Sequence, residues 1–268
     1  MTQAVLVTGA STGIGRACAV ALAAAGWRVL AGVRRPGDAP EKTEEVLLDV
    51  TSAEQIAAAA GLVEKLDGLV NNAGIARASP LEFIPPKELR YQLEVNVVGH
   101  VAVTQAFLPA LRRARGRIVF MGSIAGKSAL PFLSPYAASK HALEAIADSL
   151  RVEVRPFGIR VSIIEPGSIR TPIWTRSAQR ADELIAAADA TIDELYGERI
   201  ASFRKLALQR GAGGAPPEKV ARVVIEALTA ERPRTRYLVG RDARIRAGFE
   251  RLPDRMRDRI YERVLLRD

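Results

Sequence analysis

Seven short apolar segments divide this chain of 268 residues, and longer segments with helical spacing separate them. The apolar segments are nearly continuous rather than alternating with polar residues, which is typical of parallel strands covered on both faces. Repeated strand–helix units of this kind predict a doubly wound α/β domain with helices on both faces of its sheet. The expected strands are residues 4–8, 28–33, 46–49, 68–71, 117–121, 159–164 and 236–239.

The ends of the expected helices carry local signals. Gly26 follows the first helix as a C-terminal glycine, Thr51 or Ser52 can cap the second, and Pro156 stops the last. The expected helices are residues 13–25, from 51 or 52 to about 66, 86–113 and 136–155.

The segment from Ser168 to Pro217 breaks this rhythm. It contains a helical stretch near residues 182–204 and ends in a glycine- and proline-rich run. An insertion after the sixth strand lies at the carboxyl end of a parallel sheet, where open α/β folds bind ligands. We therefore interpret residues 1–240 as a single Rossmann-like domain with a substrate lid at about 168–215. A basic helical tail, residues 241–268, follows and is expected to pack on the same domain.

The net charge of +9 raises the question of a nucleic-acid or membrane partner. Basic residues are spread over the chain and interleaved with acids, without the aromatic residues that a single-strand binder uses for stacking. The densest basic stretch, residues 232–267, is typical of a solvated helix face with i,i+4 ion pairs. We expect no nucleic-acid partner. Peripheral contact of the tail with an anionic membrane surface is the alternative.

Other features of the composition favour a cytoplasmic protein. No apolar run reaches the roughly 20 residues that span a bilayer. The N-terminal segment has no basic region ahead of its apolar stretch, so we expect no secretory signal. Cys18 is the only cysteine, which excludes an internal disulfide. His100 and His141 have no neighbours at metal-ligand spacing, and we expect no metal site.

The first expected strand runs into a glycine-rich turn that opens the first helix. Glycines at 9, 13 and 15 give the spacing G-x-x-x-G-x-G. Gly9 permits a tight exit from the strand, while Gly13 and Gly15 let the backbone approach a pyrophosphate at the helix N-terminus. The pattern predicts a dinucleotide site. The alternative is a glycine-rich turn without a ligand.

The second expected strand ends in Arg34 and Arg35 rather than in an acid. An Asp or Glu here binds the ribose 2′-hydroxyl of NAD, whereas an arginine accommodates the 2′-phosphate of NADP. Guanidinium geometry suits phosphate, so we expect NADP(H) rather than NAD(H), with Arg34 as the main phosphate ligand. Arg35 is either a second ligand or a surface charge.

Tyr136 and Lys140 are four residues apart, and Ser123 stands thirteen residues before the tyrosine. On a helix the Tyr–Lys spacing puts both side chains on one face, with Cβ atoms roughly 5–6 Å apart. A nearby ammonium lowers the pKa of a tyrosine, about 10 when unperturbed, so that it can exchange a proton with a carbonyl or an alcohol. A surface helix with an unrelated Tyr and Lys has the same spacing, so this interpretation depends on the dinucleotide site upstream.

Several motifs occur in the order and spacing of one known family. They are the glycine loop Thr8–Gly15, Asn71-Asn72-Ala73-Gly74, the set Asn96, Ser123, Tyr136 and Lys140, and Pro166-Gly167 with Thr171. Over roughly residues 4–240 the chain resembles the short-chain dehydrogenases/reductases in their short form. The resemblance implies a seven-stranded parallel sheet in the order 3-2-1-4-5-6-7. It also implies hydride transfer between a nicotinamide cofactor and a small-molecule alcohol or carbonyl substrate.

The resemblance assigns catalytic roles to the four residues of that set. Tyr136 would be the general acid/base, and Ser123 would hold the substrate oxygen. Lys140 would lower the pKa of Tyr136 and bind the nicotinamide ribose, and Asn96 would hold a water that links Lys140 to solvent. The implied cofactor-binding residues are Gly9, Ser11, Thr12, Gly13, Ile14, Gly15, Arg34, Arg35, Asp49, Val50, Asn72, Ala73, Gly74, Tyr136, Lys140, Pro166, Gly167, Ile169 and Thr171.

Some of these cofactor contacts follow only from the resemblance. Asp49 would contact the adenine, Asn72 would lie along the cofactor, and Thr171 would bind the carboxamide. Many NADP(H)-dependent members carry a basic residue where this chain has Thr12. The 2′-phosphate would therefore rest on Arg34, with help from Ser11 or Arg35.

The lid and tail are similar to those of the branch that contains 17β-hydroxysteroid and retinol dehydrogenases. This similarity implies a bulky apolar substrate that is steroid-, retinoid- or lipid-like. A lid rich in Ala, Ile and Leu fits such a pocket, with Trp174 as an aromatic wall, although the same pattern suits a helix packed on the body. The alternatives are a small polar or acyl carbonyl, and a cofactor-binding regulator or scaffold on the same fold.

The family resemblance also implies an oligomer. Family members usually pair through the helices that begin near Pro86 and Tyr136 in this sequence. We therefore expect a homodimer or homotetramer.

Overall fold

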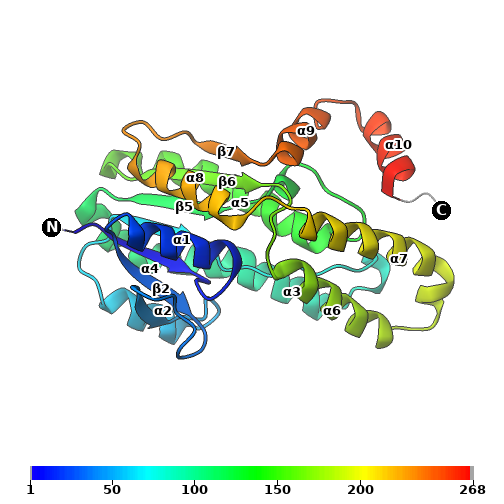
Figure 1. The fold of residues 1–268 in the computed structure, drawn as a ribbon, viewed down its shortest axis with the longest axis horizontal. Helices are drawn as coiled ribbons and strands as arrows, with labels where there is room; N and C mark the ends of the chain where they lie inside the picture. Colours follow the sequence, from blue (N-terminus) through cyan, green and yellow to red (C-terminus); the bar gives the residue numbers. More distant parts are fainter. Residues whose placement is uncertain (1, 266–268) are drawn as a thin grey trace.

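A parallel sheet of seven strands organises the fold in the computed structural model, which describes residues 2–265. The strands lie in the order β3-β2-β1-β4-β5-β6-β7, and each neighbouring pair is parallel. The predicted fold class and strand order are therefore confirmed (Figure 1). The strands are β1 (Ala4–Thr8), β2 (Arg28–Val33), β3 (Glu44–Leu47), β4 (Gly68–Asn71), β5 (Arg117–Met121), β6 (Arg160–Pro166) and β7 (Arg236–Val239).

Helices cover both faces of the sheet. They are α1 (Gly13–Ala24), α2 (Ala53–Gly61), α3 (Pro86–Leu93), α4 (Gly99–Ala114), α5 (Ser134–Glu153) and α8 (Pro217–Thr229). Leu22 of α1 and Val224 of α8 lie in the apolar core on one face. Ile56 of α2, Phe107 of α4 and Leu143 of α5 lie in the core on the other. The carboxyl ends of the strands between these layers are left for loops, which is where ligands bind in such folds.

The predicted start and end of β3 are wrong. The strand covers Glu44–Leu47 rather than residues 46–49, so Asp49 lies beyond the sheet. β3 is one of the two edge strands and pairs only with β2, so it does not need the continuous apolar run of a central strand. Glu44 is exposed and forms an ion pair with Arg28 of β2, with an N–O distance of 2.8 Å.

The predicted end of α2 is also wrong, although its beginning is confirmed. Ser52 is the cap, because its hydroxyl accepts from the Gln55 N–H at 3.2 Å. The helix ends at Gly61 instead of near residue 66, since glycine is a poor helix former. Val63 and Leu66 continue the apolar pattern beyond it, but they are buried in the core without helical backbone.

The long helix predicted over residues 86–113 is interrupted. A π-helical segment, η2 (Glu94–Val98), lies between α3 and α4. Asn96 stands inside it, and both ends of its side-chain amide bond to the backbone of Ile75 in a neighbouring loop. Single π turns inside α-helices are frequent at functional sites, and this one marks where Asn96 is displaced from the regular helix.

The lid contains two helices where the sequence predicted one helical stretch. They are α6 (Ile173–Ala186) and α7 (Thr191–Ala212), and they project beyond the sheet as a helical hairpin (Figure 1). Edge-to-face contacts of Tyr196 and Phe203 with Phe132 hold α7 on the body. The break after α6 has no Gly or Pro. Asp189 marks it instead by accepting from the Thr191 N–H at 3.0 Å.

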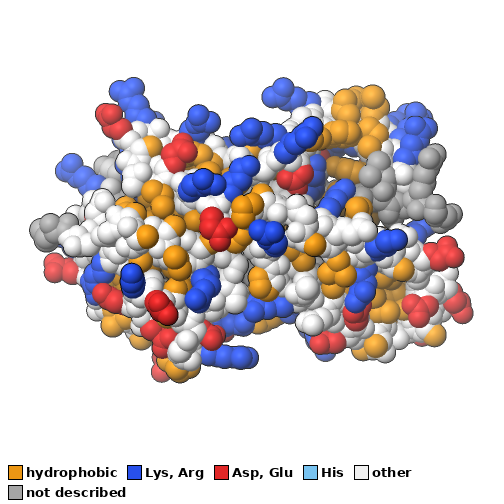
Figure 2. Space-filling model, viewed as in Figure 1, with side chains coloured by type: hydrophobic (Ala, Val, Ile, Leu, Met, Phe, Trp, Pro, Cys, Tyr) orange, Lys and Arg blue, Asp and Glu red, His pale blue; other side chains and the backbone are white. Residues whose placement is uncertain are grey.

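The tail forms α9 (Arg241–Phe249) and α10 (Asp254–Leu265); residues 266–268 of the predicted tail lie outside the described residues. Asp242 accepts from the Ser168 N–H at 2.6 Å, and Tyr261 lies 2.6 Å from the Ser128 hydroxyl. These contacts hold the tail against the loops after β6 and β5, and α10 also contacts α7. Within the described chain, no helix is long and apolar enough to cross a membrane. On the face shown in Figure 2, basic side chains are scattered among acidic ones.

Candidate active site

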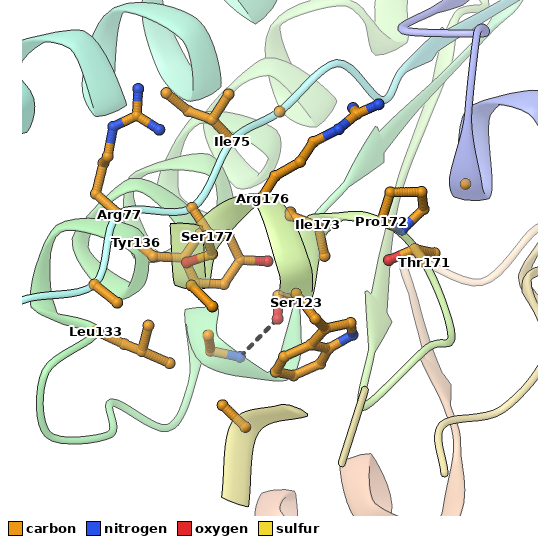
Figure 3. A pocket seen from close by; sticks show the side chains of 18 of the residues that line it. Ile75, Arg77, Ser123, Leu133, Tyr136, Thr171, Pro172, Ile173, Arg176 and Ser177 are labelled. Carbon is orange, nitrogen blue, oxygen red and sulfur yellow. Dashed lines mark hydrogen bonds between the residues drawn. The ribbon is translucent and has the colours of Figure 1, made fainter. Parts of the chain in front are cut away.

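A cavity of about 380 Å³ opens at the carboxyl ends of the strands. The glycine loop, the ends of β2, β4, β5 and β6, α5, both lid helices and α9 contribute to its walls. Figure 3 shows Ser123 and Tyr136 directed toward this space from the body, with Ile173 and Thr171 from the segment that enters the lid. The cavity therefore joins the predicted cofactor residues to the predicted catalytic residues.

The glycine loop fits a dinucleotide. Gly9 and Gly13 have φ angles of +66° and +58°, a region that favours glycine. A Cβ atom on Gly15 would lie 2.2 Å from the Gly9 carbonyl oxygen, so this position requires glycine. Thr12 caps α1 without a side-chain hydrogen bond, which leaves the first N–H groups of the helix available to an anion.

Hydrogen bonds brace this loop against the end of β4. The Thr8 hydroxyl accepts from the Asn72 N–H at 2.9 Å and from the Ala73 N–H at 3.0 Å. The Asn72 side-chain amide donates to the Thr8 carbonyl at 2.9 Å. Asn72, Ala73 and Gly74 also line the cavity, so the brace lies directly against the space for a cofactor.

Most of the predicted cofactor residues line the cavity, but Gly15 and Arg35 do not. Gly15 lies behind the loop, close to the Gly9 carbonyl and the Asn72 side chain. Arg34 lines the cavity at the end of β2 and is exposed there. Asp49 also lines it, and its carboxylate accepts from the backbone and hydroxyl of Thr51 at 2.9 and 2.7 Å.

Tyr136, Ser123 and Lys140 meet at one wall of the cavity. The Lys140 Nζ atom lies 5.7 Å from the centre of the Tyr136 ring and donates to the Met121 carbonyl at 2.7 Å. Ser123 caps a short 3-10 turn, where its Oγ accepts from the Ala125 N–H at 3.1 Å. This places a hydroxyl, a phenol and a buried ammonium side by side.

Burial governs the charges at this wall. It raises the pKa of Tyr136, while the Ser123 hydroxyl and the positive charge of Arg246 act in the opposite direction. Burial lowers the pKa of Lys140 from 10.5 to about 8. Because burial outweighs the other effects on Tyr136 in this structure, the lowering of its pKa by Lys140 stays a prediction.

Asn96 is fully buried behind this wall and does not line the cavity. Its amide nitrogen donates to the Ile75 carbonyl at 3.0 Å and to the Ser139 hydroxyl at 3.1 Å, and its oxygen accepts from the Ile75 N–H at 2.9 Å. The side chain is thus already bonded at both ends. The predicted water link from Asn96 to Lys140 stays a prediction.

His100 lies close to the same wall, although its sequence context suggested no special role. It is fully buried, and its Nε2 atom lies 2.6 Å from the Ala73 carbonyl oxygen. Burial first, and then the charge of Lys140, lower the pKa of His100 to about 3, so the ring is neutral at physiological pH. Within residues 2–265 no cluster of His, Cys, Asp or Glu could hold a metal ion.

The lid makes the other half of the cavity largely apolar. Trp174 lines it and donates its ring N–H to the Ile169 carbonyl at 2.7 Å, so the indole is both a wall and a packing residue. Further apolar side chains on this side are Leu130, Phe132, Leu133, Ile173, Ile185, Ile200, Phe203 and Leu206.

A set of arginines that the sequence did not single out surrounds this apolar half. They are Arg77, Arg176, Arg204, Arg210 and Arg246. No motif marks them, and they come from four separate parts of the chain.

A dinucleotide loop and a Tyr–Ser–Lys set on one cavity define an oxidoreductase of the Rossmann-like class. The chain belongs to the short-chain dehydrogenase/reductase family, because the family described as "short chain dehydrogenase" matches residues 3–182. It is an enzyme that acts on alcohol or carbonyl groups with a nicotinamide cofactor.

Relatives extend over nearly the whole chain. An NADPH-dependent 3-dehydrocapnine reductase of Ornithobacterium rhinotracheale is 35% identical, covering 97% of this chain and 96% of the relative. Human 17-beta-hydroxysteroid dehydrogenase type 6 is 38% identical, covering 90% and 81%. A short chain dehydrogenase of Burkholderia cenocepacia, solved in complex with NADP, has a TM-score of 0.76 at 27% identity, covering 100% and 98%. The predicted resemblance to the hydroxysteroid and retinol dehydrogenase branch is confirmed.

Proposed function

We propose that this protein is an NADP(H)-dependent oxidoreductase that interconverts an alcohol with a ketone or aldehyde on a bulky apolar substrate. One observation carries the proposal: Tyr136, Ser123 and Lys140 share a cavity with the glycine loop on one side and apolar lid residues on the other. A substrate whose carbonyl group lies at this wall would have its apolar body against the lid.

In carbonyl reduction, each residue of this wall has a separate role. When bound, the reduced nicotinamide supplies a hydride to the carbonyl carbon. Ser123 donates a hydrogen bond to the carbonyl oxygen, and Tyr136 transfers its phenolic proton to that oxygen, so that an alcohol forms. Lys140 stabilises the phenolate that is left, and a proton from solvent restores Tyr136. Alcohol oxidation follows the same steps in reverse.

The preference for NADP(H) rests on Arg34. Its guanidinium lines the cavity at the end of β2, where the ribose of a bound dinucleotide would lie. The acidic residue that follows, Asp38, is exposed and does not line the cavity. The NADPH-dependent relative and the NADP-bound structure described above support the same preference.

Arg34→Asp is expected to raise KM for NADPH about 100-fold while changing KM for NADH much less. The variant removes a charge-assisted contact to the 2′-phosphate and adds a repelling carboxylate. Steady-state kinetics with both cofactors measures the effect, and Arg35→Asp is the matched control because Arg35 does not line the cavity. Equal changes in the two KM values would contradict the phosphate role of Arg34.

The apolar substrate can be tested directly by NADPH oxidation with a panel of ketones and aldehydes. The panel runs from small polar carbonyls through acyl carbonyls to steroid-, retinoid- and lipid-like compounds. The proposal requires higher kcat/KM for the bulky apolar members. A preference for small polar or acyl carbonyls would reject the apolar pocket, and binding of NADPH without any turnover would favour a regulator or scaffold.

Exposed apolar side chains lie where the expected oligomer would form its interface. Tyr91 of α3, Val98 of η2 and Val152 of α5 are large apolar side chains exposed on the helices through which family members pair. We expect light scattering to give the mass of a dimer or tetramer, and Val152→Glu to shift it toward the monomer. Leu195→Glu, at an exposed apolar position on the lid, is the control. A monomeric wild-type protein would contradict this part of the proposal.

A further inference from the structure

Two arginines of the substrate half of the cavity stand apart from the others. Arg77 is paired with Glu88 at 2.7 Å, and Arg204 is paired with Asp182 at 2.8 Å. Arg176 is exposed, so water can solvate it. Arg210 of α7 and Arg246 of α9 are half-buried, and among the described residues no carboxylate lies within ion-pair distance of either.

Only one nitrogen of the Arg246 guanidinium forms a hydrogen bond among the described residues. Its Nη2 atom donates to the Ser128 carbonyl at 2.7 Å. Its Nε atom is buried, with no hydrogen-bond partner among the described residues. Nε has almost no accessible surface, so only the Nη groups of Arg246 are available to an anion in the cavity.

Arg210 adds a second positive charge beside the first. The pKa of Arg246 is lowered, first by burial and then by the neighbouring charge of Arg210, although Tyr261, Asp242 and Glu250 act in the opposite direction. Two cations brought together in a partly buried wall repel each other unless an anion lies between them.

The two carboxylates whose charges act on Arg246 are already engaged elsewhere. Asp242 accepts from the Ser168 N–H at 2.6 Å, which fixes the loop after β6. Glu250 pairs with Arg257 and accepts from the Tyr261 hydroxyl at 3.3 Å. Among residues 2–265, therefore, no carboxylate serves as a close counter-ion, while Arg210 and Arg246 line the same cavity as Tyr136.

We infer that Arg210 and Arg246 bind an anionic group of the substrate, so that the substrate is an amphiphile. Its carbonyl or alcohol lies at Tyr136, its apolar body lies against the lid, and its carboxylate, sulfonate or phosphate lies between the two arginines. Guanidinium groups bind such oxyanions through paired N–H donors. This inference rests on the proposed function and adds to it the chemical class of the substrate and a role for the tail.

The test compares ω-oxo carboxylic acids of increasing chain length with their methyl esters as substrates for NADPH oxidation. At the chain length that reaches from Tyr136 to the arginines, the wild-type enzyme is expected to prefer the acid by about ten-fold or more in kcat/KM. Arg246→Gln and Arg210→Gln are each expected to reduce this preference about ten-fold, with a much smaller change for the ester. Arg246→Lys, which keeps the charge, is expected to retain part of the preference.

Arg244→Gln is the matched control, because Arg244 is exposed on the same helix and does not line the cavity. It is expected to leave both substrates unaffected. Circular dichroism melts of each variant separate a folding defect from a binding defect. Sulfonate and phosphate analogues at the best chain length then identify the preferred oxyanion.

Two outcomes would overturn the inference while leaving the proposed function intact. One is equal turnover of acids and esters at every chain length. The other is an equal loss for acid and ester in Arg246→Gln. Failure of the proposed function looks different, because then no carbonyl compound of any class would oxidise NADPH.

Discussion

Tyr136→Phe is expected to lower kcat/KM for carbonyl reduction by roughly 10³-fold, within the range that general acid catalysis contributes. The variant keeps the ring and removes only the hydroxyl group whose proton the carbonyl oxygen must receive. The surrounding packing and the glycine loop stay as they are, so NADPH binding is expected to change little. Steady-state kinetics gives the first quantity, and titration of NADPH fluorescence gives the second.

Tyr196→Phe provides the control for this experiment. It removes the hydroxyl that donates to Glu82 at 2.9 Å on the lid, and Tyr196 does not line the cavity. Turnover of Tyr136→Phe near the wild-type level would contradict the assignment of Tyr136 as the acid. Loss of turnover together with loss of NADPH binding would instead mean that the substitution disrupts the cofactor site.

Local patterns in the sequence predicted most of the sheet and the tight glycine turn after β1. The strands β1, β2, β4, β5 and β7 occupy the predicted residues, whereas β6 covers Arg160–Pro166 rather than residues 159–164. The glycine loop is also local, since its function depends on the backbone of one turn. β3 was misplaced because its first two residues, Glu44 and Glu45, are exposed and interrupt the apolar pattern, which an edge strand tolerates.

The remaining parts of the site depend on contacts between distant residues. The π segment at Asn96 has no Gly or Pro signal and coincides with side-chain bonds to Ile75. Arg246 reaches the cavity by bonding to Ser128, which is 118 residues away along the chain. Periodicity and motifs cannot predict such a contact, so the tail looked like a solvated basic helix in the sequence.

Lys140 is expected to make the protein less stable while making catalysis possible. Burial lowers the pKa of Lys140 from 10.5 to about 8, which corresponds to about 3 kcal/mol of unfavourable free energy for the charged form. Below pH 8 the ammonium is charged in both the folded and the unfolded protein, so the whole cost is present at pH 7. Between pH 8 and 10.5 residue 140 binds more protons in the unfolded chain than in the folded protein. The free energy of unfolding therefore rises with pH in this range.

Lys140→Met is therefore expected to be more stable than the wild type at pH 7, by about 2 kcal/mol, and to lose turnover by at least roughly 100-fold. Methionine fills a similar volume without a charge, although the Met121 carbonyl loses its donor. The stability advantage is expected to shrink from pH 8 to pH 10, because only the wild type releases this proton. Denaturant unfolding of the cofactor-free proteins at several pH values measures both effects.

Lys65→Met is the control, because Lys65 is exposed. It should reproduce the wild-type pH dependence and activity. If Lys140→Met were less stable than the wild type at pH 7 and the difference did not change up to pH 10, Lys140 would not be a strained buried ammonium. If its stability rose as expected while turnover survived, Tyr136 would not need a neighbouring cation for proton transfer. A gain in stability together with a loss of turnover is the result expected of a buried catalytic lysine, since an environment that disfavours its charge is also one in which that charge would act strongly on a neighbouring tyrosine.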